Sequence, residues 1–260
     1  MEATLLEWLN LVARWVHVIA AIMWIGDSFL FMWLDRSLHA PTKPREGEVV
    51  GELWMVHSGG FYEVVKRKSL RPEEMPATLH WFKWESYTTW LSGFFLLVVV
   101  YYLGSGVQLV DASILDVSHG AAVALSLGLL AGAVLFYDIV WRTLGASRPD
   151  VALGASYLLL VAGVLGVTRL FPGRAAYLQV GAMLATVMAS NVFFRIIPAQ
   201  RHMLAQTAAG QPVDTSYGAR AKHRSTHNPY VTLPVLVTML ANHSPCTFGD
   251  AHPDVVLLLL

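Results

Sequence analysis

The chain has 260 residues, of which 55% are hydrophobic and only 14% are charged, and its formal net charge at neutral pH is zero. This composition departs from that of soluble domains in the direction expected of membrane proteins, so we expect lipid, and not nucleic acid, as a partner. Cys246 is the only cysteine, which excludes an internal disulfide and the Cys-x-x-Cys-His attachment of a c-type haem.

Long apolar segments dominate the chain. A spanning helix needs roughly 20 mostly apolar residues, and five segments approach that length: Trp8–Leu34, Tyr87–Gly104, His119–Trp141, Val151–Leu170 and Ala175–Ile197. A shorter sixth, Tyr230–His243, ends in a polar turn, and Val255–Leu260 starts another apolar run. We therefore predict an all-α, polytopic transmembrane helix bundle with about six spans and the start of a seventh, and read residues 1–260 as a single multi-helix membrane domain.

The positive charge is distributed asymmetrically between the two sides of these segments. Fifteen of the 18 Lys and Arg residues lie in segments 35–86, 142–150 and 195–229, and the exceptions are Arg14, Arg169 and Arg174. The positive-inside rule places those three segments in the cytoplasm and the N-terminus outside. The start of the chain lacks the basic region of a signal peptide, so we expect the first helix to be retained.

Several polar residues fall inside the predicted spans, where each needs a partner or a function. On the first helix, Arg14, His17, Trp24 and Ser28 share one stripe, with Asp27 at its edge. This stripe is either a hydrogen-bonded seam between helices or a cofactor or ion site. The pairs Asp138/Arg142 and Asn191/Arg195, each four residues apart, are more simply structural.

Three histidines on three different helices lie toward the predicted outer side. They are His17, His119 and His243. Neutral imidazole is a common axial ligand of haem b, usually supplied by facing helices of a bundle. Two of the three histidines could form such an axial pair, although each alone could also be an interfacial histidine that hydrogen-bonds a neighbour.

Two segments on the predicted cytoplasmic side are rich in His, basic and aromatic residues. One runs from His80 to Tyr87 and the other from Lys222 to Tyr230. Together they could line a site for a flat anionic ligand, because aromatic side chains stack on such a ligand and Lys or Arg neutralises it. The alternative is an interfacial aromatic belt with basic residues that only fix the topology. His223 and His227 would share a helical face, but two histidines alone do not identify a zinc site.

Several uncommon strings resemble the bacterial membrane-bound urate oxidases: Arg14-Trp15-Val16-His17, Trp24-Ile25-Gly26, Gly59-Gly60-Phe61-Tyr62, His80-Trp81-Phe82-Lys83-Trp84-Glu85, Thr226-His227-Asn228-Pro229-Tyr230 and Asn242-His243-Ser244-Pro245. Those proteins join an N-terminal multi-helix membrane domain to a C-terminal cytochrome c domain. The resemblance implies oxidation of urate to 5-hydroxyisourate in purine catabolism, with electrons passed to cytochrome c. It also implies a multi-pass protein of the bacterial inner membrane with a periplasmic N-terminus.

This sequence ends before a cytochrome domain, so we expect a chain truncated before that domain. Any c-type haem would belong to a partner or to the missing domain.

A urate site would need a positive group, hydrogen-bonding groups and an aromatic wall, because urate is a planar monoanion near neutral pH. We assign substrate binding to Lys83, Trp84, His223 and Asn228. The candidates for the base that removes a urate proton are His80, Glu85 and His227, since imidazole titrates near neutrality and a buried carboxylate can be tuned upward. A haem b held by His17, His119 or His243 could relay the electrons.

Two other functional classes fit the same sequence. The chain could be a transporter or channel for a small anion, with Arg14, His17, Asp27 and Asn191 lining a polar path. It could also be a non-catalytic membrane anchor that docks a cytochrome.

Overall fold

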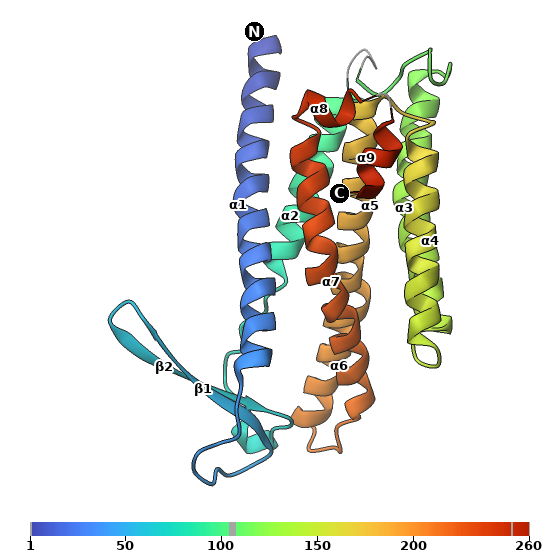
Figure 1. Cartoon of the computed structure of the whole chain (residues 1–260). Helices are drawn as coiled ribbons and strands as arrows, with labels where there is room; N and C mark the ends of the chain where they lie inside the picture. Colours follow the sequence, from blue (N-terminus) through green and yellow to red (C-terminus); the bar gives the residue numbers. More distant parts are fainter. Residues whose placement is uncertain (1, 104–107, 251, 260) are drawn as a thin grey trace. The chain divides into compact units, whose positions relative to one another are not determined.

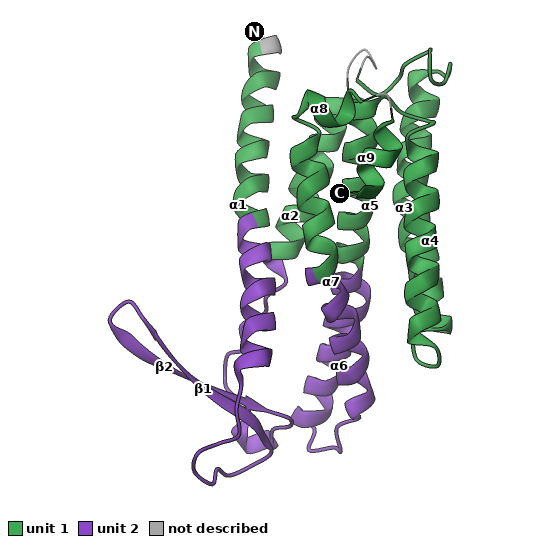
Figure 2. Ribbon diagram, viewed as in Figure 1, with its two compact units in different colours: residues 1–21, 85–190, 230–260 green, residues 22–84, 191–229 purple. Residues whose placement is uncertain are grey.

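The computed structural model describes residues 2–103, 108–250 and 252–259, and most of these residues are helical. The chain divides into two compact units, shown in two colours in Figure 2. Unit 1 contains residues 1–21, 85–190 and 230–260, and unit 2 contains residues 22–84 and 191–229. The prediction of a single membrane domain over residues 1–260 stays a prediction.

The first helix, α1 (Glu2–Ser37), is the longest element. Its 36 residues measure about 54 Å at 1.5 Å per residue, which exceeds the roughly 30 Å hydrocarbon core of a bilayer. Its small residues Ala13 and Ala20 are buried, whereas Trp8, Trp15 and Ile22 are more than half exposed. Exposed large apolar side chains are expected on a helix that faces lipid.

Helix α5 (Gly173–Asn191) makes polar contacts with two other helices of unit 1. Trp90 on α2 (Trp84–Leu97) donates to Thr186 at 3.1 Å, and Gln179 exchanges hydrogen bonds with Ser126 on α3 (His119–Thr143). The unit also contains the π-helical turn η2 (Val98–Tyr102), α4 (Pro149–Val167), α8 (Pro245–Phe248), α9 (Pro253–Leu259) and residues 230–241 of α7. Tyr177 and Phe171 are its largest fully buried apolar side chains. Figure 1 labels these helices.

Local sequence signals explain several helix ends. Ser118 caps α3 by accepting a hydrogen bond from the Ala121 amide at 3.3 Å, and Pro149 begins α4, where its missing N–H costs nothing. Pro198 lies at the start of α6 (Ile197–Ala208), immediately after the π-helical turn η3 (Val192–Ile196). Because proline cannot donate to the preceding turn, a change of helical geometry is expected at this point.

Four helices are long and apolar enough to cross a membrane: Thr4–Ser37, His119–Thr143, Pro149–Val167 and Gly173–Ala208. The expectation of about six spans is therefore supported for four segments of the described chain. Residues 87–102 and 230–241 are helical but fall short of a span. Polar residues, including Glu85, begin α2, and the first half of α7 (Thr215–Ala241) is basic. Gly104 and Leu260, which end two predicted segments, lie outside the described residues.

The all-α prediction needs one correction, because segment 35–86 contains an antiparallel hairpin of β1 (Val49–His57) and β2 (Gly60–Arg67). The two strands are joined by Ser58 and Gly59, with φ of 52° and 76°. Positive φ at both residues is the type I′ geometry that matches the twist of a hairpin, and glycine adopts it without strain. Unit 2 also contains the end of α1, the short η1 (Pro72–Glu74), η3, α6 and residues 215–229 of α7.

Candidate functional site

His17, halfway along α1, is held against α2 by two hydrogen bonds. Its Nδ1 lies 3.0 Å from the carbonyl oxygen of Thr89 and 3.1 Å from Oγ of Ser92. A carbonyl oxygen can only accept, so Nδ1 carries the proton and donates it. The lone pair of His17 is therefore on Nε2. This is the arrangement that orients a metal-binding histidine, in which one ring nitrogen donates to a carbonyl and the other can bind a metal.

Gly93 allows the His17 ring to approach the backbone of α2. A Cβ atom at position 93 would lie 2.8 Å from Cε1 of His17 and 3.2 Å from its Nδ1. These distances are shorter than a normal van der Waals contact, so any larger residue would displace the ring or separate the helices. The sequence analysis selected His17 but missed Gly93 and Ser92, because the contact joins residues about 75 positions apart.

His119, the first residue of α3, is oriented differently. Its Nε2 donates to the carbonyl oxygen of Tyr102 at 2.9 Å. Its Nδ1 is buried and has no hydrogen-bond partner among the described residues. The Tyr102 hydroxyl bonds to Ser126 at 2.6 Å, and Ser126 in turn donates to Gln179 at 2.6 Å. His119 thus lies at one end of a buried polar network between helices of unit 1.

The described contacts do not bring His17 and His119 together as an axial pair. His17 contacts the α2 segment at Gly93, and His119 contacts the same segment at Tyr102, nine residues farther on. Nine helical residues correspond to about 13 Å along the helix, which separates the two contacts. This separation is too large for two imidazoles that bind the same iron atom from opposite sides. His243 is exposed. The geometry of His17 fits one axial ligand of a haem b, and the described contacts do not supply the second.

Two of the predicted cytoplasmic histidines are neighbours in unit 2. The rings of His223 and His227 on α7 lie 4.7 Å apart and are tilted by 69°. Burial, together with the nearby His223 and Arg224, lowers the pKa of His227 to about 4. His227 is therefore a neutral imidazole near pH 7, able to accept a proton. Among the described residues, no group of three His, Cys, Asp or Glu side chains forms a metal site.

Asn228 follows this histidine pair and is buried, with 5% of its surface exposed. The side-chain amide of Asn191, itself buried, donates to Oδ1 of Asn228 at 3.2 Å. This hydrogen bond joins two helices, and the predicted pair of Asn191 with Arg195 stays a prediction. Arg224 is also buried, with 6% exposed. This part of α7 thus presents amide, guanidinium and imidazole groups away from bulk water.

The segment before α2 carries the other predicted site residues. The exposed ring of His80 lies 4.6 Å from the ring of Phe82, which packs against Phe31 of α1 at 4.8 Å. Lys83 Nζ lies 5.4 Å from the ring centres of both Trp81 and Trp84, within the range of a cation–π interaction. This segment combines aromatic surface with positive charge, as the sequence predicted.

Glu85 completes the predicted group, and it differs from the others in two ways. It falls in unit 1, whereas His80, Lys83, Trp84, His223, His227 and Asn228 all fall in unit 2. Its Oε2 atom is buried without a hydrogen-bond partner among the described residues. Such an atom needs an explanation, because buried polar atoms are normally satisfied by protein, water, a proton or a ligand.

The sequence analysis missed a buried carboxylate, Glu52, at the base of the hairpin. Glu52 accepts from the amide and hydroxyl of Thr42, both at 2.9 Å, and forms an ion pair with Arg45 at 2.6 Å. Arg45 also pairs with Glu63. The hydrogen bonds from Thr42, together with Arg45, lower the pKa of Glu52 to about 2. The contacts show that Glu52 organises the loop that precedes β1.

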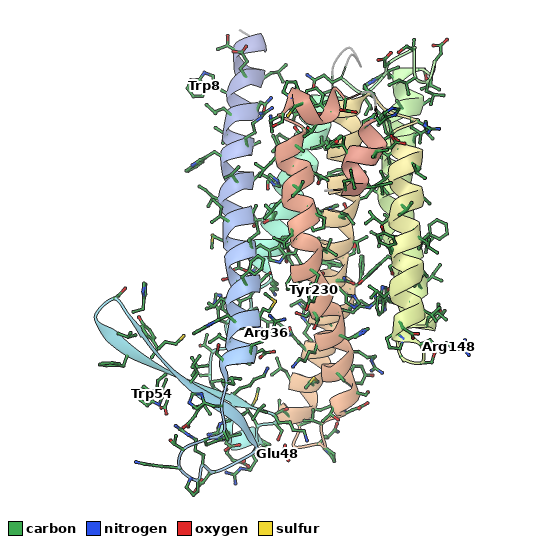
Figure 3. The ribbon with its side chains drawn as sticks, viewed as in Figure 1. Trp8, Arg36, Glu48, Trp54, Arg148 and Tyr230 are labelled. Carbon is green, nitrogen blue, oxygen red and sulfur yellow. The ribbon has the colours of Figure 1, made fainter. Side chains whose placement is uncertain are left out.

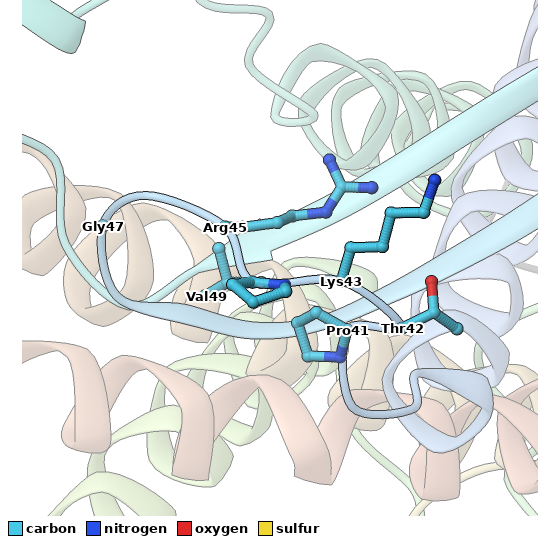
Figure 4. A pocket seen from close by; sticks show the side chains of 7 residues that line it. Pro41, Thr42, Lys43, Arg45, Gly47 and Val49 are labelled. Carbon is cyan, nitrogen blue, oxygen red and sulfur yellow. The ribbon is translucent and has the colours of Figure 1, made fainter.

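An open hollow of about 370 Å³ lies over this loop (Figure 4). It is lined by Pro41, Thr42, Lys43, Pro44, Arg45, Gly47 and Val49. The charge of Arg45 is already compensated by Glu52 and Glu63, and none of the predicted site residues lines the hollow. We therefore do not assign the substrate to it.

Replacing Glu52 by Gln should loosen this loop. The Gln side chain has the same size as Glu but carries no charge. It therefore cannot form the ion pair with Arg45, and its neutral oxygen accepts the hydrogen bonds from Thr42 more weakly. We expect hydrogen exchange in residues 41–45, followed by mass spectrometry, to become several-fold faster, with no change in Glu73→Gln, whose side chain is exposed. Because the folded pKa is about 2, the ordering should persist above about pH 4.5 and decline as the pH falls toward 2. Equal exchange in both variants would contradict this role of Glu52.

Comparison with known proteins supplies the family. The family model described as urate oxidase N-terminal matches residues 3–260, which is nearly the whole chain. Neither a curated protein nor a solved structure matches the chain. The chain belongs to the urate oxidase N-terminal family.

Proposed function

We propose that this chain is the membrane module of a urate oxidase that converts urate to 5-hydroxyisourate and passes the electrons to cytochrome c. The family match across residues 3–260 is the observation that carries the proposal. Four helices able to cross a membrane support a membrane-bound enzyme. The reaction takes urate and water to 5-hydroxyisourate, two protons and two electrons, so the enzyme needs a proton acceptor and an electron acceptor.

The urate site is assigned to residues of unit 2. Lys83 and the ring of Trp84 supply positive charge and an aromatic surface within one short segment. His223 and Asn228 supply hydrogen-bonding groups from α7. His227 is one candidate base: its low pKa keeps it unprotonated near pH 7 and also makes it a weaker proton acceptor than an ordinary histidine. His80 and Glu85 are the other candidate bases.

His17 is assigned as a ligand of haem b, which when bound would carry single electrons toward the cytochrome. The observation in favour is the Nδ1 hydrogen bond to Thr89, which leaves the Nε2 lone pair available. His243 stays a candidate for a second ligand, whereas His119, at a separate level from His17, could bind a haem only without it. The c-type haem would belong to a separate cytochrome or to a cytochrome domain.

The proposed location is the bacterial inner membrane, with the N-terminus in the periplasm. The concentration of Lys and Arg in segments 35–86, 142–150 and 195–229 supports this orientation.

In a Cys246→Ser background, a cysteine at Thr42 should react with an impermeant reagent only after the membrane is opened. A cysteine at Pro172 should react from the periplasm, and the reverse pattern would refute the orientation.

The function is tested by urate-dependent reduction of cytochrome c in membranes that contain the complete protein. We expect cytochrome reduction and formation of 5-hydroxyisourate in a ratio of two electrons per urate. A protein that forms no product but carries urate across liposomes would instead be a transporter. A protein that does neither but binds cytochrome c would be an anchor. Either result would refute the proposed enzyme.

A further inference from the structure

The outer half of the β1–β2 hairpin exposes an unusual amount of apolar surface. Trp54 is 57% exposed, Val56 70%, Phe61 80% and Tyr62 50%. Figure 3 labels Trp54 on this hairpin. A two-stranded hairpin is at best marginally stable alone in water, so exposed aromatic side chains on it indicate that another phase or molecule covers them.

These side chains point to both faces of the hairpin. In the strand register Val56 pairs with Phe61, Met55 with Tyr62, and Trp54 with Glu63. Since successive side chains alternate between faces, Trp54, Val56 and Phe61 share one face, and Met55 and Tyr62 lie on the other. A globular partner would cover one face of such a ribbon, whereas lipid can surround both.

The base of the hairpin is built differently. There Glu52 is buried and bound by Thr42 and Arg45, and His39 pairs with Glu52 through two backbone hydrogen bonds of 2.9 and 3.2 Å. Charges at the base are thus paired and one strand edge is covered. Val50 at the base is 55% exposed, but the exposed aromatic side chains of the hairpin all lie in the outer half.

The hairpin is anchored to the end of a candidate membrane span. Lys66 near the end of β2 forms an ion pair with Asp35, which lies in the last turn of the span Thr4–Ser37. Just before Asp35 on α1, the large side chains Phe31 and Trp33 are 44% and 49% exposed. Tryptophan and tyrosine concentrate where spans meet water. The Lys66–Asp35 ion pair therefore ties the base of the hairpin to the last turn of this candidate span, beside exposed aromatic side chains of the kind found at a membrane surface.

We propose that residues Trp54–Tyr62 lie in the lipid–water interface of the bilayer, on the side where α1 ends. The aromatic and aliphatic side chains would enter the acyl boundary. The polar turn at His57 and Ser58 and the open strand edges would keep hydrogen bonds with headgroups and water, which the hydrocarbon core cannot provide. The hairpin is then a monotopic anchor that fixes unit 2 to the membrane surface. This inference depends on α1 crossing the membrane and not on urate oxidation.

Site-directed spin labelling tests this placement directly. The full chain, with Cys246→Ser to remove its exposed thiol, is reconstituted into vesicles of phosphatidylethanolamine and phosphatidylglycerol. Nitroxides are attached at Phe61→Cys, at Glu73→Cys as an aqueous reference, and at Leu158→Cys on α4 as a hydrocarbon reference. Collision rates with oxygen, which concentrates in lipid, and with a water-soluble nickel complex are then measured for each site.

The oxygen-to-nickel ratio at position 61 should exceed that at position 73 several-fold and stay below that at position 158. Adding Trp54→Ser and Val56→Ser should lower it toward the aqueous value, because the apolar neighbours hold the hairpin in the interface. A ratio equal to that at position 73 would place the hairpin in water and overturn the proposal. An immobilised label with low access to both reagents would indicate a protein partner or a second copy, and would overturn it too. An unchanged ratio in the serine variants would show that the apolar side chains do not hold the hairpin in the interface, and would overturn the anchor role as well.

Discussion

Replacement of His227 by Ala should lower urate-dependent cytochrome c reduction by about 10²–10⁴-fold, the usual contribution of a general base. The reason is that burial holds the pKa of His227 at about 4, so that this histidine, unlike one with an ordinary pKa, is almost entirely deprotonated from pH 5 upward. The measurement is the initial rate of cytochrome reduction in membranes with equal amounts of enzyme.

The matched control is His202→Ala on the neighbouring helix α6. His202 is exposed, and its ring lies 4.1 Å from the ring of Tyr217 at a tilt of 35°, so its loss should leave the rate unchanged. An unaltered rate in His227→Ala would exclude this residue as the base and leave His80 and Glu85, which His80→Ala and Glu85→Gln test in the same assay.

The same pKa predicts a pH dependence of stability. Because the unfolded chain binds a proton at His227 with a pKa of 6.5 and the folded chain only at about 4, its contribution to folding stability should fall as the pH drops from about 6.5 to 4. His227→Gln should flatten this part of the profile of thermal unfolding against pH. An unchanged slope would show that the histidine is not desolvated in the folded protein.

Replacement of His17 by Ala should remove most of the haem b from the purified protein, and Gly93→Ala should disturb it without removing a ligand. A methyl group at position 93 would lie 2.8 Å from Cε1 of His17, so the imidazole must shift and the Soret band and midpoint potential should shift with it. Overpacking of this kind typically costs about 1–3 kcal/mol, so the unfolding temperature should fall as well.

Gly128→Ala on α3 provides the control, since a Cβ at that position would have no other atom within 4 Å. In an exposed helix interior alanine is favoured over glycine, so this variant should be as stable as the parent or more so. Identical haem spectra for Gly93→Ala and Gly128→Ala would refute a ligand role for His17. A lowered unfolding temperature with no haem in the parent protein would show that the His17–Gly93 contact is only structural.

The sequence by itself determined where most helices run. Runs of apolar residues such as Trp8–Leu34 and His119–Trp141 predicted α1 and α3, because helix formation and membrane compatibility depend on the local chain. The runs at 87–104 and 230–243 were less decisive, since polar residues flank short apolar stretches there. The hairpin also has a local sequence signal, because Ser58-Gly59 between alternating apolar residues predicts a type I′ turn.

Only the tertiary structure decided the surroundings of the candidate site residues. The bonds from His17 to Thr89 and Ser92, and from Asn191 to Asn228, join residues 37 to 75 positions apart. Helical periodicity correctly placed His223 and His227 on one face of α7, but it could not show that His227 is desolvated. Nor could it show that His17 and His119 contact α2 and η2 at separate levels. Periodicity specifies which residues share a face of one helix, whereas burial and pairing arise from packing between segments that sequence spacing does not relate.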